Sequence, residues 1–195
     1  MSRLVGHTAP DFTADAVING EIKTINFNKD FAGKWKVLYF YPLDFTFVCP
    51  TEITAFEDNL QKFRELNCEV IGCSVDSAFS HLAWTQIERN KGGLGKMQHP
   101  LAADITKNIA RSYEVLSGDA VALRGVFVID DKNVVQTATV NNLSVGRNVE
   151  EVLRTVEAYQ YTAKHGEVCP AGWTKGKATM KPDPKGSQEY FNKLK

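Results

Sequence analysis

Short runs of consecutive apolar residues and stretches of helical spacing follow one another along the chain. Residues 36–41 are rich in aromatic and aliphatic side chains and end at Pro42, which is typical of a strand buried on both faces. From Pro50 to Phe63 the apolar residues recur every three or four positions, which predicts an amphipathic helix of about four turns. A second buried strand is predicted over 69–75. A strand, a helix and a strand in this order form a βαβ unit, so the two strands should be parallel.

The second half of the chain adds helices and a hairpin to this unit. Helical spacing returns in three later segments: 78–90, 106–113 and 149–163. In the first of these, Leu82, Ala83 and Ile87 are expected to face the core. A strand over 125–129 is followed by turn residues and by a second apolar run over 134–140, which predicts an antiparallel hairpin.

The order of these elements predicts an α/β protein with a thioredoxin-like fold. N-terminal additions precede the first buried strand, and a C-terminal arm that contains several Pro and Gly residues follows the last helix. We therefore expect a domain over 1–165 and an arm over 166–195. The length of 195 residues agrees with one domain and an extension.

Composition and charge argue against several functional classes. The chain is 43% hydrophobic and 24% charged, an ordinary globular profile, and its formal net charge is +0. We expect no nucleic-acid partner, because bulk positive charge is lacking. We expect no membrane partner, because no stretch of about 18 apolar residues occurs. No apolar signal core follows the first residues, so the expected location is cytoplasmic.

The four cysteines point away from metal and dithiol sites. They lie at positions 49, 68, 73 and 169 and form no C-x-x-C pair. The histidines show no short spacing to cysteine, so we expect no metal site. In a reducing compartment, unpaired cysteines serve packing or chemistry. Cys68 and Cys73 lie on or beside the predicted second strand, where packing is the expected role.

Cys49 lies between a buried strand and the start of a helix. Such a junction exposes unpaired backbone N–H groups and the positive end of the helix dipole, which favour the thiolate form of a cysteine. Pro50 is compatible with the first helical turn. Thr46 lies three residues earlier, and on one helical turn its hydroxyl would share a face with the sulfur. The alternative is a packing cysteine beside a turn proline, and the junction position favours chemistry.

The segment around Cys49 resembles the active-site signature of the peroxiredoxin family. Pro42-x-x-x-Thr46-x-x-Cys49 is the family pattern, and the longer segment 45–52 is similar to the typical 2-Cys branch. Other segments resemble the family in order and spacing: 6–12, 81–84, 123–131, 145–147 and 165–173. The resemblance therefore covers essentially the whole chain and implies a thiol-specific peroxidase.

The resemblance implies a role for each residue of the signature. Cys49 would be the peroxidatic cysteine, whose thiolate attacks the O–O bond of a hydroperoxide and becomes a sulfenic acid. Thr46 would align the peroxide, and Pro42 would shield the sulfenic acid from water. Arg124 would stabilise the thiolate and the charge on the departing oxygen.

Two further residues are implied as a pair that orients Arg124. Glu52 lies in the first turn of the predicted helix, and Arg147 lies in a loop before the last helix. For these three charged residues the alternative is a position on the solvated surface: a cation before a strand, a first-turn acid and a loop cation.

Cys169 is implied as the resolving cysteine, which in typical 2-Cys peroxiredoxins attacks the sulfenic acid of the partner subunit. The implied working unit is a homodimer, with a ring of five dimers as the larger assembly. Thioredoxin is the implied reductant, with a bacterial-type flavoprotein reductase as the alternative. No metal, haem, flavin or nicotinamide cofactor is expected, because the sulfur itself performs the redox chemistry. The alternative for Cys169 is a free thiol in the arm.

Two other functional hypotheses remain open. The first is a binding or chaperone protein, because higher assemblies in this family act as holdases. Such a role does not need Cys49, so the Cys49→Ser variant separates it from the peroxidase. The second is a one-cysteine peroxiredoxin, which Cys169 in its matching motif disfavours.

Overall fold

The computed structural model describes residues 4–193, which form two compact units. The first unit ends at Val149 and the second begins at Glu150. Helix α6 (Val149–His165) therefore lies almost entirely in the second unit. The predicted arm over 166–195 begins after this helix, whereas the second unit includes it.

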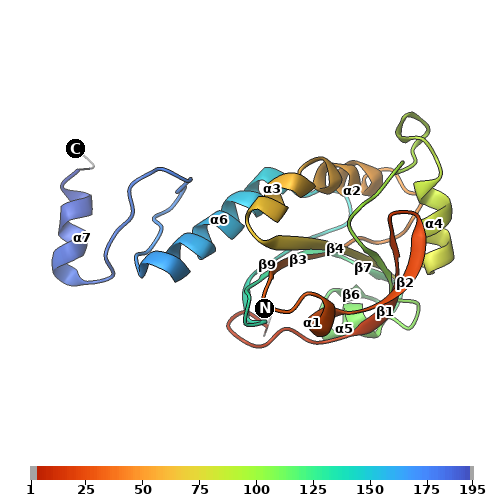
Figure 1. The fold of residues 1–195 in the computed structure, drawn as a ribbon, viewed down its shortest axis with the longest axis horizontal. Coiled ribbons are helices and arrows are strands. Elements are labelled where there is room, and N and C mark those ends of the chain that lie inside the picture. Colours follow the sequence, from red (N-terminus) through yellow and green to blue (C-terminus); the bar gives the residue numbers. More distant parts are fainter. Residues whose placement is uncertain (1–3, 194–195) are drawn as a thin grey trace. The chain divides into compact units, whose positions relative to one another are not determined.

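Within residues 4–193, the first unit contains one large mixed sheet (Figure 1). Its strand order is β2-β1-β5-β4-β3-β8-β9. Its strands are β1 (Thr13–Ile18), β2 (Glu21–Asn26), β3 (Trp35–Phe40), β4 (Cys68–Ser74), β5 (Leu101–Ala103), β8 (Arg124–Ile129) and β9 (Val135–Asn141). Two short strands pair separately: β6 (Leu116–Ser117) and β7 (Val121–Ala122).

The centre of the sheet confirms the predicted βαβ unit. β3 and β4 pair in parallel, with Val37 opposite Val70, and every residue of β3 is buried. β8 and β9 form the predicted antiparallel hairpin. β3 lies between β4 and β8. β3, which leads into the loop before Cys49, and β8, which begins at Arg124, are therefore neighbouring strands.

Helices cover both faces of this sheet. α2 (Cys49–Asp58) and α3 (Leu60–Glu65) lie on one face, and α1 (Phe27–Asp30) and α5 (Asn108–Ser112) lie on the other (Figure 1). α4 (Ala78–Thr85) contacts β1 and β5. The sheet is therefore covered on both sides, which is why its central strands are apolar at consecutive positions.

Each face of the sheet has its own aromatic contacts. On one face, the ring of Tyr39 stacks on Phe56 of α2, with centroids 4.3 Å apart. The next residue, Phe40, belongs to the opposite core and packs against Tyr113 and Phe127 at centroid distances of 5.4 and 5.9 Å. Successive side chains of β3 thus point to opposite faces, as the strand pleat requires.

Two helices end earlier than their apolar spacing predicts. The single helix predicted from Pro50 to Phe63 is divided at Asn59, whose side-chain amide donates to the carbonyl oxygen of Ala55 at 2.9 Å. An asparagine side chain that bonds the local backbone competes with helix continuation. The helix predicted over 78–90 ends at Thr85 and is followed by the short 3₁₀ turn η1 (Arg89–Lys91).

The buried face of α4 also differs from the prediction. Leu82 and Ile87 are only half-buried and Ala83 is exposed, so the prediction that these three residues face the core is wrong. His81 and Trp84 are fully buried instead. A prediction from apolar spacing places histidine on the surface. His81 can be buried because it has a polar partner, Asp44, inside the first unit.

The N-terminal additions form a hairpin that the sequence analysis does not predict. β1 and β2 are joined by Asn19 and Gly20, whose φ angles are 52° and 78°. A two-residue turn with both φ angles positive is the type I′ hairpin turn, for which Asn-Gly is the preferred dipeptide. The Asn19-Gly20 dipeptide could therefore have predicted this hairpin from the sequence.

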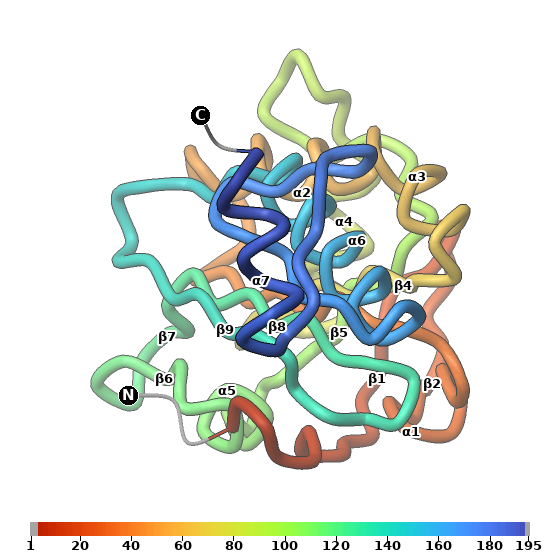
Figure 2. Tube along the Cα trace, turned by 90° about the vertical axis from the view of Figure 1, so that its left-hand side faces the viewer, coloured from red at the N-terminus to blue at the C-terminus, as the bar shows by residue number. Residues whose placement is uncertain are grey.

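The second unit consists of α6, an irregular segment and helix α7 (Pro184–Phe191), shown in blue in Figure 2. Val168 and Met180 form an isolated antiparallel bridge within the irregular segment. Asp183 caps α7, because its carboxylate accepts hydrogen bonds from backbone N–H groups of the first turn. Short local contacts of this kind, rather than a sheet, organise the segment that carries Cys169.

Candidate active site

Cys49 is the first residue of α2 and is fully buried, with 0% of its surface exposed. Pro50 occupies the first turn, and Val48 precedes the helix without a side-chain cap. Because the first backbone N–H groups of a helix have no partner inside it, the thiol lies at the positive end of the helix dipole. The predicted position of Cys49 at a strand-to-helix junction is confirmed.

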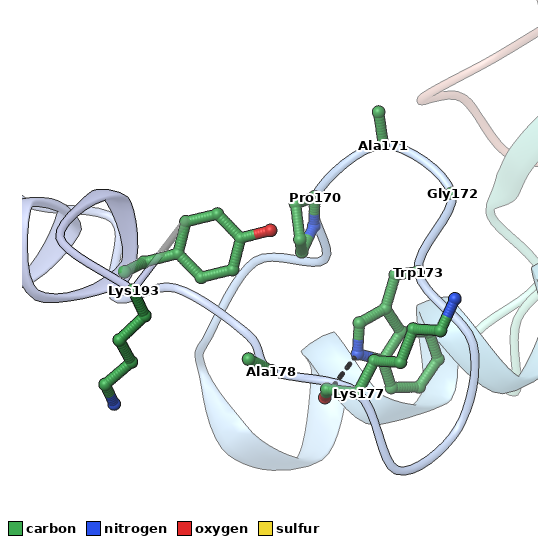
Figure 3. A pocket seen from close by; sticks show the side chains of 8 residues that line it. Pro170, Ala171, Gly172, Trp173, Lys177, Ala178 and Lys193 are labelled. Atoms are coloured by element: carbon green, nitrogen blue, oxygen red, sulfur yellow. Dashed lines mark hydrogen bonds between the residues drawn. The ribbon is translucent and has the colours of Figure 1, made fainter. Parts of the chain in front are cut away.

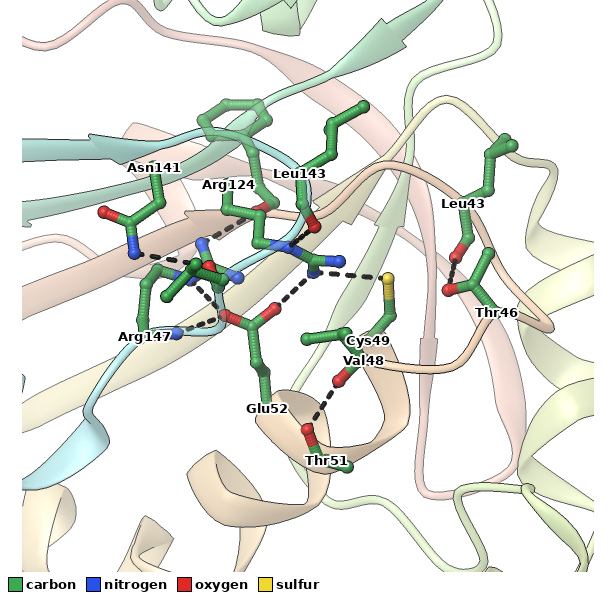
Figure 4. A network of polar contacts seen from close by, with 12 residues as sticks. Leu43, Thr46, Val48, Cys49, Thr51, Glu52, Arg124, Asn141, Leu143 and Arg147 are labelled. Carbon is green, nitrogen blue, oxygen red and sulfur yellow. Dashed lines mark hydrogen bonds and ion pairs between the residues drawn. The ribbon is translucent and has the colours of Figure 1, made fainter.

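Arg124 places a permanent positive charge against the sulfur. It is the first residue of β8 and is only 3% exposed. Its Nη1 donates to Cys49 Sγ at 3.4 Å and to Glu52 Oε2 at 2.6 Å, and its Nε donates to the carbonyl oxygen of Leu143 at 2.7 Å (Figure 4). A guanidinium at this distance stabilises a thiolate over a thiol.

Glu52 connects Arg124 to a second buried arginine. Glu52 Oε1 accepts hydrogen bonds from the backbone N–H of Arg147 at 2.7 Å and from its Nε at 2.8 Å. Arg147 Nη1 also donates to the carbonyl oxygens of Phe40, at 2.7 Å, and Gly125. These contacts hold the carboxylate between the two guanidinium groups, as Figure 4 shows.

The formal charges of this cluster do not sum to zero. The side chains of Arg124, Glu52 and Arg147 are 4%, 2% and 2% exposed, so water screens them little. Two cations and one carboxylate leave one uncompensated positive charge. The sulfur of Cys49 lies 3.4 Å from one of the two cations, Arg124. The surface alternative for these three charged residues is therefore wrong.

The loop before α2 carries Pro42, which is buried, and Thr46, which is half-buried. Thr46 Oγ1 donates to the carbonyl oxygen of Leu43 at 3.0 Å. The prediction that Thr46 shares a helical turn with the cysteine is wrong, because the helix begins only at Cys49. Phe45 has a φ of 55°, a left-handed conformation that costs a residue with a Cβ about 1–2 kcal/mol.

Two groups beside the site were not predicted from the sequence. The carbonyl oxygen of Leu143 orients Arg124, and a backbone acceptor of this kind leaves no sequence signal. Asp44 is buried in the loop between Pro42 and Thr46. A charged residue inside an otherwise apolar loop was the available signal for Asp44.

Cys169 lies in the second unit, in the irregular segment after α6, and is half-buried. Its Sγ lies 3.7 Å from the carbonyl oxygen of Ala158, a weak S–H contact. Burial raises the pKa of the Cys169 thiol above its ordinary value, while the charge of Arg154 lowers it and that of Glu167 raises it. Cys169 is therefore protonated at neutral pH.

A hollow of about 310 Å³ opens in the second unit beside Pro170, the residue after Cys169 (Figure 3). Trp173 and Tyr190 contribute aromatic side chains to its wall, and the Trp173 indole N–H donates to the carbonyl oxygen of Lys177 at 3.0 Å. The surroundings of Cys169 are thus more open than those of Cys49.

The other two cysteines are packing residues, as predicted. Cys68 and Cys73 are buried on β4, and burial raises the pKa of both thiols far above the ordinary value. In the described part of the chain, no group of three or more His, Cys, Asp or Glu side chains is placed to hold a metal ion. No helix among residues 4–193 is both long and apolar enough to cross a membrane.

Comparisons with known proteins place this site in a family. The model of the AhpC/TSA family matches residues 5–138, and the model of the C-terminal domain of 1-Cys peroxiredoxin matches residues 158–193. A relative from Hordeum vulgare named 2-Cys peroxiredoxin BAS1, chloroplastic, is 56% identical over 189 residues, which are 96% of this chain and 90% of that protein. This chain belongs to the AhpC/TSA family, in its 2-Cys peroxiredoxin branch.

Two further similar proteins support the assignment of this chain to the 2-Cys peroxiredoxins. A solved structure of Plasmodium vivax 2-Cys peroxiredoxin in the reduced state superposes with a TM-score of 0.94 at 48% identity, covering 97% of this chain and 98% of that one. A relative from Trypanosoma brucei rhodesiense named thioredoxin peroxidase is 54% identical over 192 residues, 97% of this chain and 96% of that protein. The predicted thioredoxin-like α/β fold is confirmed.

The expected cytoplasmic location is contradicted by these relatives. The Hordeum vulgare protein is named as chloroplastic, and so are relatives from Chattonella marina var. antiqua and Spinacia oleracea at 56% and 54% identity. The expectation was wrong because the lack of an apolar signal core argues only against a secretory signal, whereas organelle transit peptides are amphipathic and contain no such core.

Proposed function

We propose that this peroxiredoxin is a thioredoxin-dependent thiol peroxidase that reduces hydrogen peroxide and organic hydroperoxides at Cys49. The observation that carries the proposal is the 3.4 Å contact between Arg124 Nη1 and Cys49 Sγ inside a buried cluster that lacks one negative charge. The name of the thioredoxin peroxidase relative supports thioredoxin as the reductant. By consuming hydroperoxides, the enzyme would serve antioxidant defence and redox signalling.

The first step is a displacement at oxygen. The thiolate of Cys49 attacks one oxygen of the hydroperoxide, the S–O bond forms as the O–O bond breaks, and the sulfur becomes a sulfenic acid. The departing alkoxide or hydroxide takes up a proton and leaves as alcohol or water. Arg124 stabilises the charge on this oxygen. The hydroxyl hydrogen of Thr46 is donated to Leu43, so its oxygen is oriented to accept the O–H of the peroxide.

Exclusion of water protects the sulfenic acid. Pro42 is buried in the loop before α2 and has no backbone N–H, so it offers no donor to water. Glu52 and Arg147 act through Arg124, because their contacts fix the orientation of its guanidinium group. We assign Pro42 the shielding role and the other two residues a positioning role.

The second step forms a disulfide with Cys169 of the partner subunit. The Cys169 thiol gives up its proton and attacks the sulfenic sulfur of Cys49, the S–S bond forms, and hydroxide leaves and takes that proton to give water. Because Cys49 is fully buried in the first turn of α2, this turn must unwind before the sulfur atoms can meet. The dithiol of thioredoxin then reduces the disulfide by two thiol–disulfide exchanges.

Exposed aromatic side chains support self-association of the first unit. Phe47 is 94% exposed, Phe79 is 76% exposed and Phe45 is 53% exposed. Apolar exposure of this size is typical of interaction surfaces. We therefore retain the homodimer and the ring of five dimers as the proposed assembly, and sedimentation velocity of the reduced protein measures it directly.

The test is non-reducing gel electrophoresis after one equivalent of hydrogen peroxide. We expect a dimer band in the wild type and in the control variant Cys68→Ala, and no such band in Cys49→Ser or Cys169→Ser. Thioredoxin with its reductase should reverse the band. A wild type that stays monomeric, with Cys49 untouched or oxidised to sulfinic acid, would contradict the resolving role of Cys169.

The same variants test the chaperone hypothesis. Suppression of aggregation of a client protein by Cys49→Ser, with its peroxidase activity lost, would show that a holdase activity coexists with the peroxidase. If Cys49→Ser keeps the peroxidase activity, the proposed function is wrong.

A further inference from the structure

Two buried histidines of the first unit each face a carboxylate. His81 of α4 faces Asp44, with 2.8 Å between Nδ1 and Oδ2, and His99 faces Glu57 of α2, with 2.7 Å between Nδ1 and Oε2. All four side chains are at most 6% exposed. The pairs look alike, but the tyrosine contacts differ: Tyr39 contacts the histidine of its pair, whereas Tyr41 contacts the carboxylate as well as the histidine of its pair.

In the second pair, a neutral histidine satisfies every contact. His99 Nδ1 donates to Glu57, and the hydroxyl of Tyr39 lies 2.8 Å from His99 Nε2 and donates to it. A neutral imidazole has one N–H donor and one acceptor nitrogen, which are the two groups required here.

In the first pair, both ring nitrogens face acceptors. His81 Nδ1 lies 2.8 Å from Asp44 Oδ2, and Nε2 lies 3.2 Å from the carbonyl oxygen of Ala102 on β5. The hydroxyl of Tyr41 lies 2.9 Å from Asp44 Oδ1 and 3.3 Å from His81 Nδ1, and we assign its one hydrogen to the shorter contact, with Asp44. A neutral ring therefore has one hydrogen for two contacts. Both contacts are filled only when an additional proton is held by the ring or shared with the carboxylate.

We infer that His81 is a positioning residue for Cys49, because it holds a proton against Asp44 and thereby fixes the loop that begins at Pro42. This inference rests on the proposed role of Cys49 as the reacting thiol. An imidazolium beside a carboxylate is neutral as a pair, so the pair can remain buried where a single charge could not.

The loop needs such an anchor because its backbone is strained. Phe45, next to Asp44, has a φ of 55°, which side chains of this size rarely adopt. The backbone N–H of Asp44 donates to Asp76 Oδ2 at 2.9 Å, and the Phe45 ring lies 5.6 Å from the ring of Trp84. His81 and Trp84 lie one turn apart on the buried face of α4, so this helix holds both Asp44 and Phe45.

The titratable groups that contact the pair are Tyr41 at the end of β3 and Asp76 after β4, while β5 contributes the carbonyl of Ala102. Burial, and next the charge of Asp44, raise the pKa of Tyr41 well above its ordinary value, so its hydroxyl stays neutral and has one hydrogen to donate.

Neutron crystallography of the reduced wild-type protein tests the proton count. We expect hydrogen in both contacts of His81, that is, on Nε2 and between Nδ1 and Asp44 Oδ2. His99 serves as the internal comparison and should carry hydrogen on Nδ1 alone. A His81 ring that lacks hydrogen on Nε2, or that has none between Nδ1 and the carboxylate, overturns the inference.

The rate of Cys49 oxidation by hydrogen peroxide, followed by stopped-flow tryptophan fluorescence, tests the positioning role. His81→Ala leaves the Asp44 carboxylate buried without its partner, and we expect the rate constant to fall about tenfold or more, since small misplacements of reacting groups have effects of this size. In Asp44→Asn the rate constant should fall less, about threefold, because the new amide can donate to Nδ1 of a neutral His81 ring.

Glu57→Gln is the matched control, because it makes the same change in the other pair, and its rate should equal that of the wild type. The positioning role fails if His81→Ala stays within about twofold of the wild type, a change too small for a displaced loop. The inference that His81 holds a proton against Asp44 fails if Cys49 is oxidised as slowly in Asp44→Asn as in His81→Ala. Failure of the proposed function itself would be recognised separately, because Cys49→Ser would then still react with peroxide.

Discussion

Cys49 and Cys169 lie in opposite surroundings. Cys49 is fully buried at a helix start, with a guanidinium nitrogen of Arg124 at 3.4 Å from its sulfur. Cys169 is half-buried in an irregular segment, and a carbonyl oxygen lies 3.7 Å from its sulfur. The first environment places a helix start and a cation against the sulfur, and in the second the pKa of the thiol is raised by burial. This difference is the basis on which we propose Cys49 as the thiol that attacks peroxide and Cys169 as the thiol that attacks the sulfenic acid.

Burial alone does not make this difference. Cys68 and Cys73 are as inaccessible as Cys49, yet burial raises the pKa of both thiols and leaves them inert. Cys49 has in addition the helix start and the cation of Arg124. The difference between these cysteines therefore lies in the charges near the sulfur. The buried charge of Arg124 in turn needs a partner, which Glu52 provides.

The largest expected effect comes from removing the carboxylate of the buried cluster. Glu52 accepts three hydrogen bonds from Arg124 and Arg147, so Glu52→Gln removes the carboxylate that lies between two buried cations. We expect the free energy of unfolding to fall by about 3–5 kcal/mol. Urea denaturation of the reduced protein at one fixed protein concentration measures this loss.

Glu151→Gln is the matched control in the second unit. Glu151 also pairs with an arginine, Arg154, at 2.6 Å, but the two side chains are 56% and 29% exposed. An ion pair in contact with water contributes less than about 1 kcal/mol, so this variant should lose little. If the free energy of unfolding fell as little in Glu52→Gln as in Glu151→Gln, the cluster around Cys49 would contribute no more to stability than a surface ion pair.

The next effect concerns the reaction with peroxide. Arg124→Met removes the cation beside the sulfur, and we expect the second-order rate constant for hydrogen peroxide to fall by about 10²–10³-fold, the usual result of deleting one oriented donor at a developing charge. Stopped-flow measurement with a small excess of peroxide gives this rate constant. Arg154→Met, which removes the cation near Cys169, should leave it unchanged. A fall of less than about tenfold in Arg124→Met would mean that the helix start alone activates Cys49.

Local patterns predicted the parts of the fold that depend on neighbouring residues. The apolar runs at 36–41 and 69–75 became β3 and β4 because a strand covered on both faces has no polar side to interrupt it. The junction at Cys49 was equally local, since Pro50 marks the first turn of α2. The resemblance to peroxiredoxins supplied Arg124 and Arg147, which no pattern around Cys49 contains.

Contacts between distant segments could not be predicted in this way. Arg124 and Glu52 are 72 positions apart, and they meet because β8 pairs with β3, directly before the loop that leads to α2. The face of α4 was mispredicted for a related reason, because His81 is buried by a contact with Asp44, 37 positions away. Thr46 shows that a three-residue spacing does not establish a helical turn when the helix has not yet begun.

The smallest expected effect concerns the thiol of Cys169. The charge of Arg154 lowers the pKa of this thiol and that of Glu167 raises it, so Arg154→Met should raise the pKa further and Glu167→Gln should lower it. Because only the thiolate reacts, alkylation by iodoacetamide at pH 7 should become slower in Arg154→Met and faster in Glu167→Gln, each by about threefold at this half-buried site.

The measurement is made in the Cys49→Ser background, where Cys68 and Cys73 are buried and Cys169 is the accessible thiol among the three that remain. The alkylation rate should rise with pH as the thiolate fraction increases, and it should still be rising where an ordinary cysteine has levelled off, because the pKa of Cys169 is raised. The double variant that also carries Cys169→Ser supplies the baseline. If the rate levels off below the range of an ordinary cysteine, Cys169 is an activated thiol like Cys49, and the division of roles between the two cysteines does not hold.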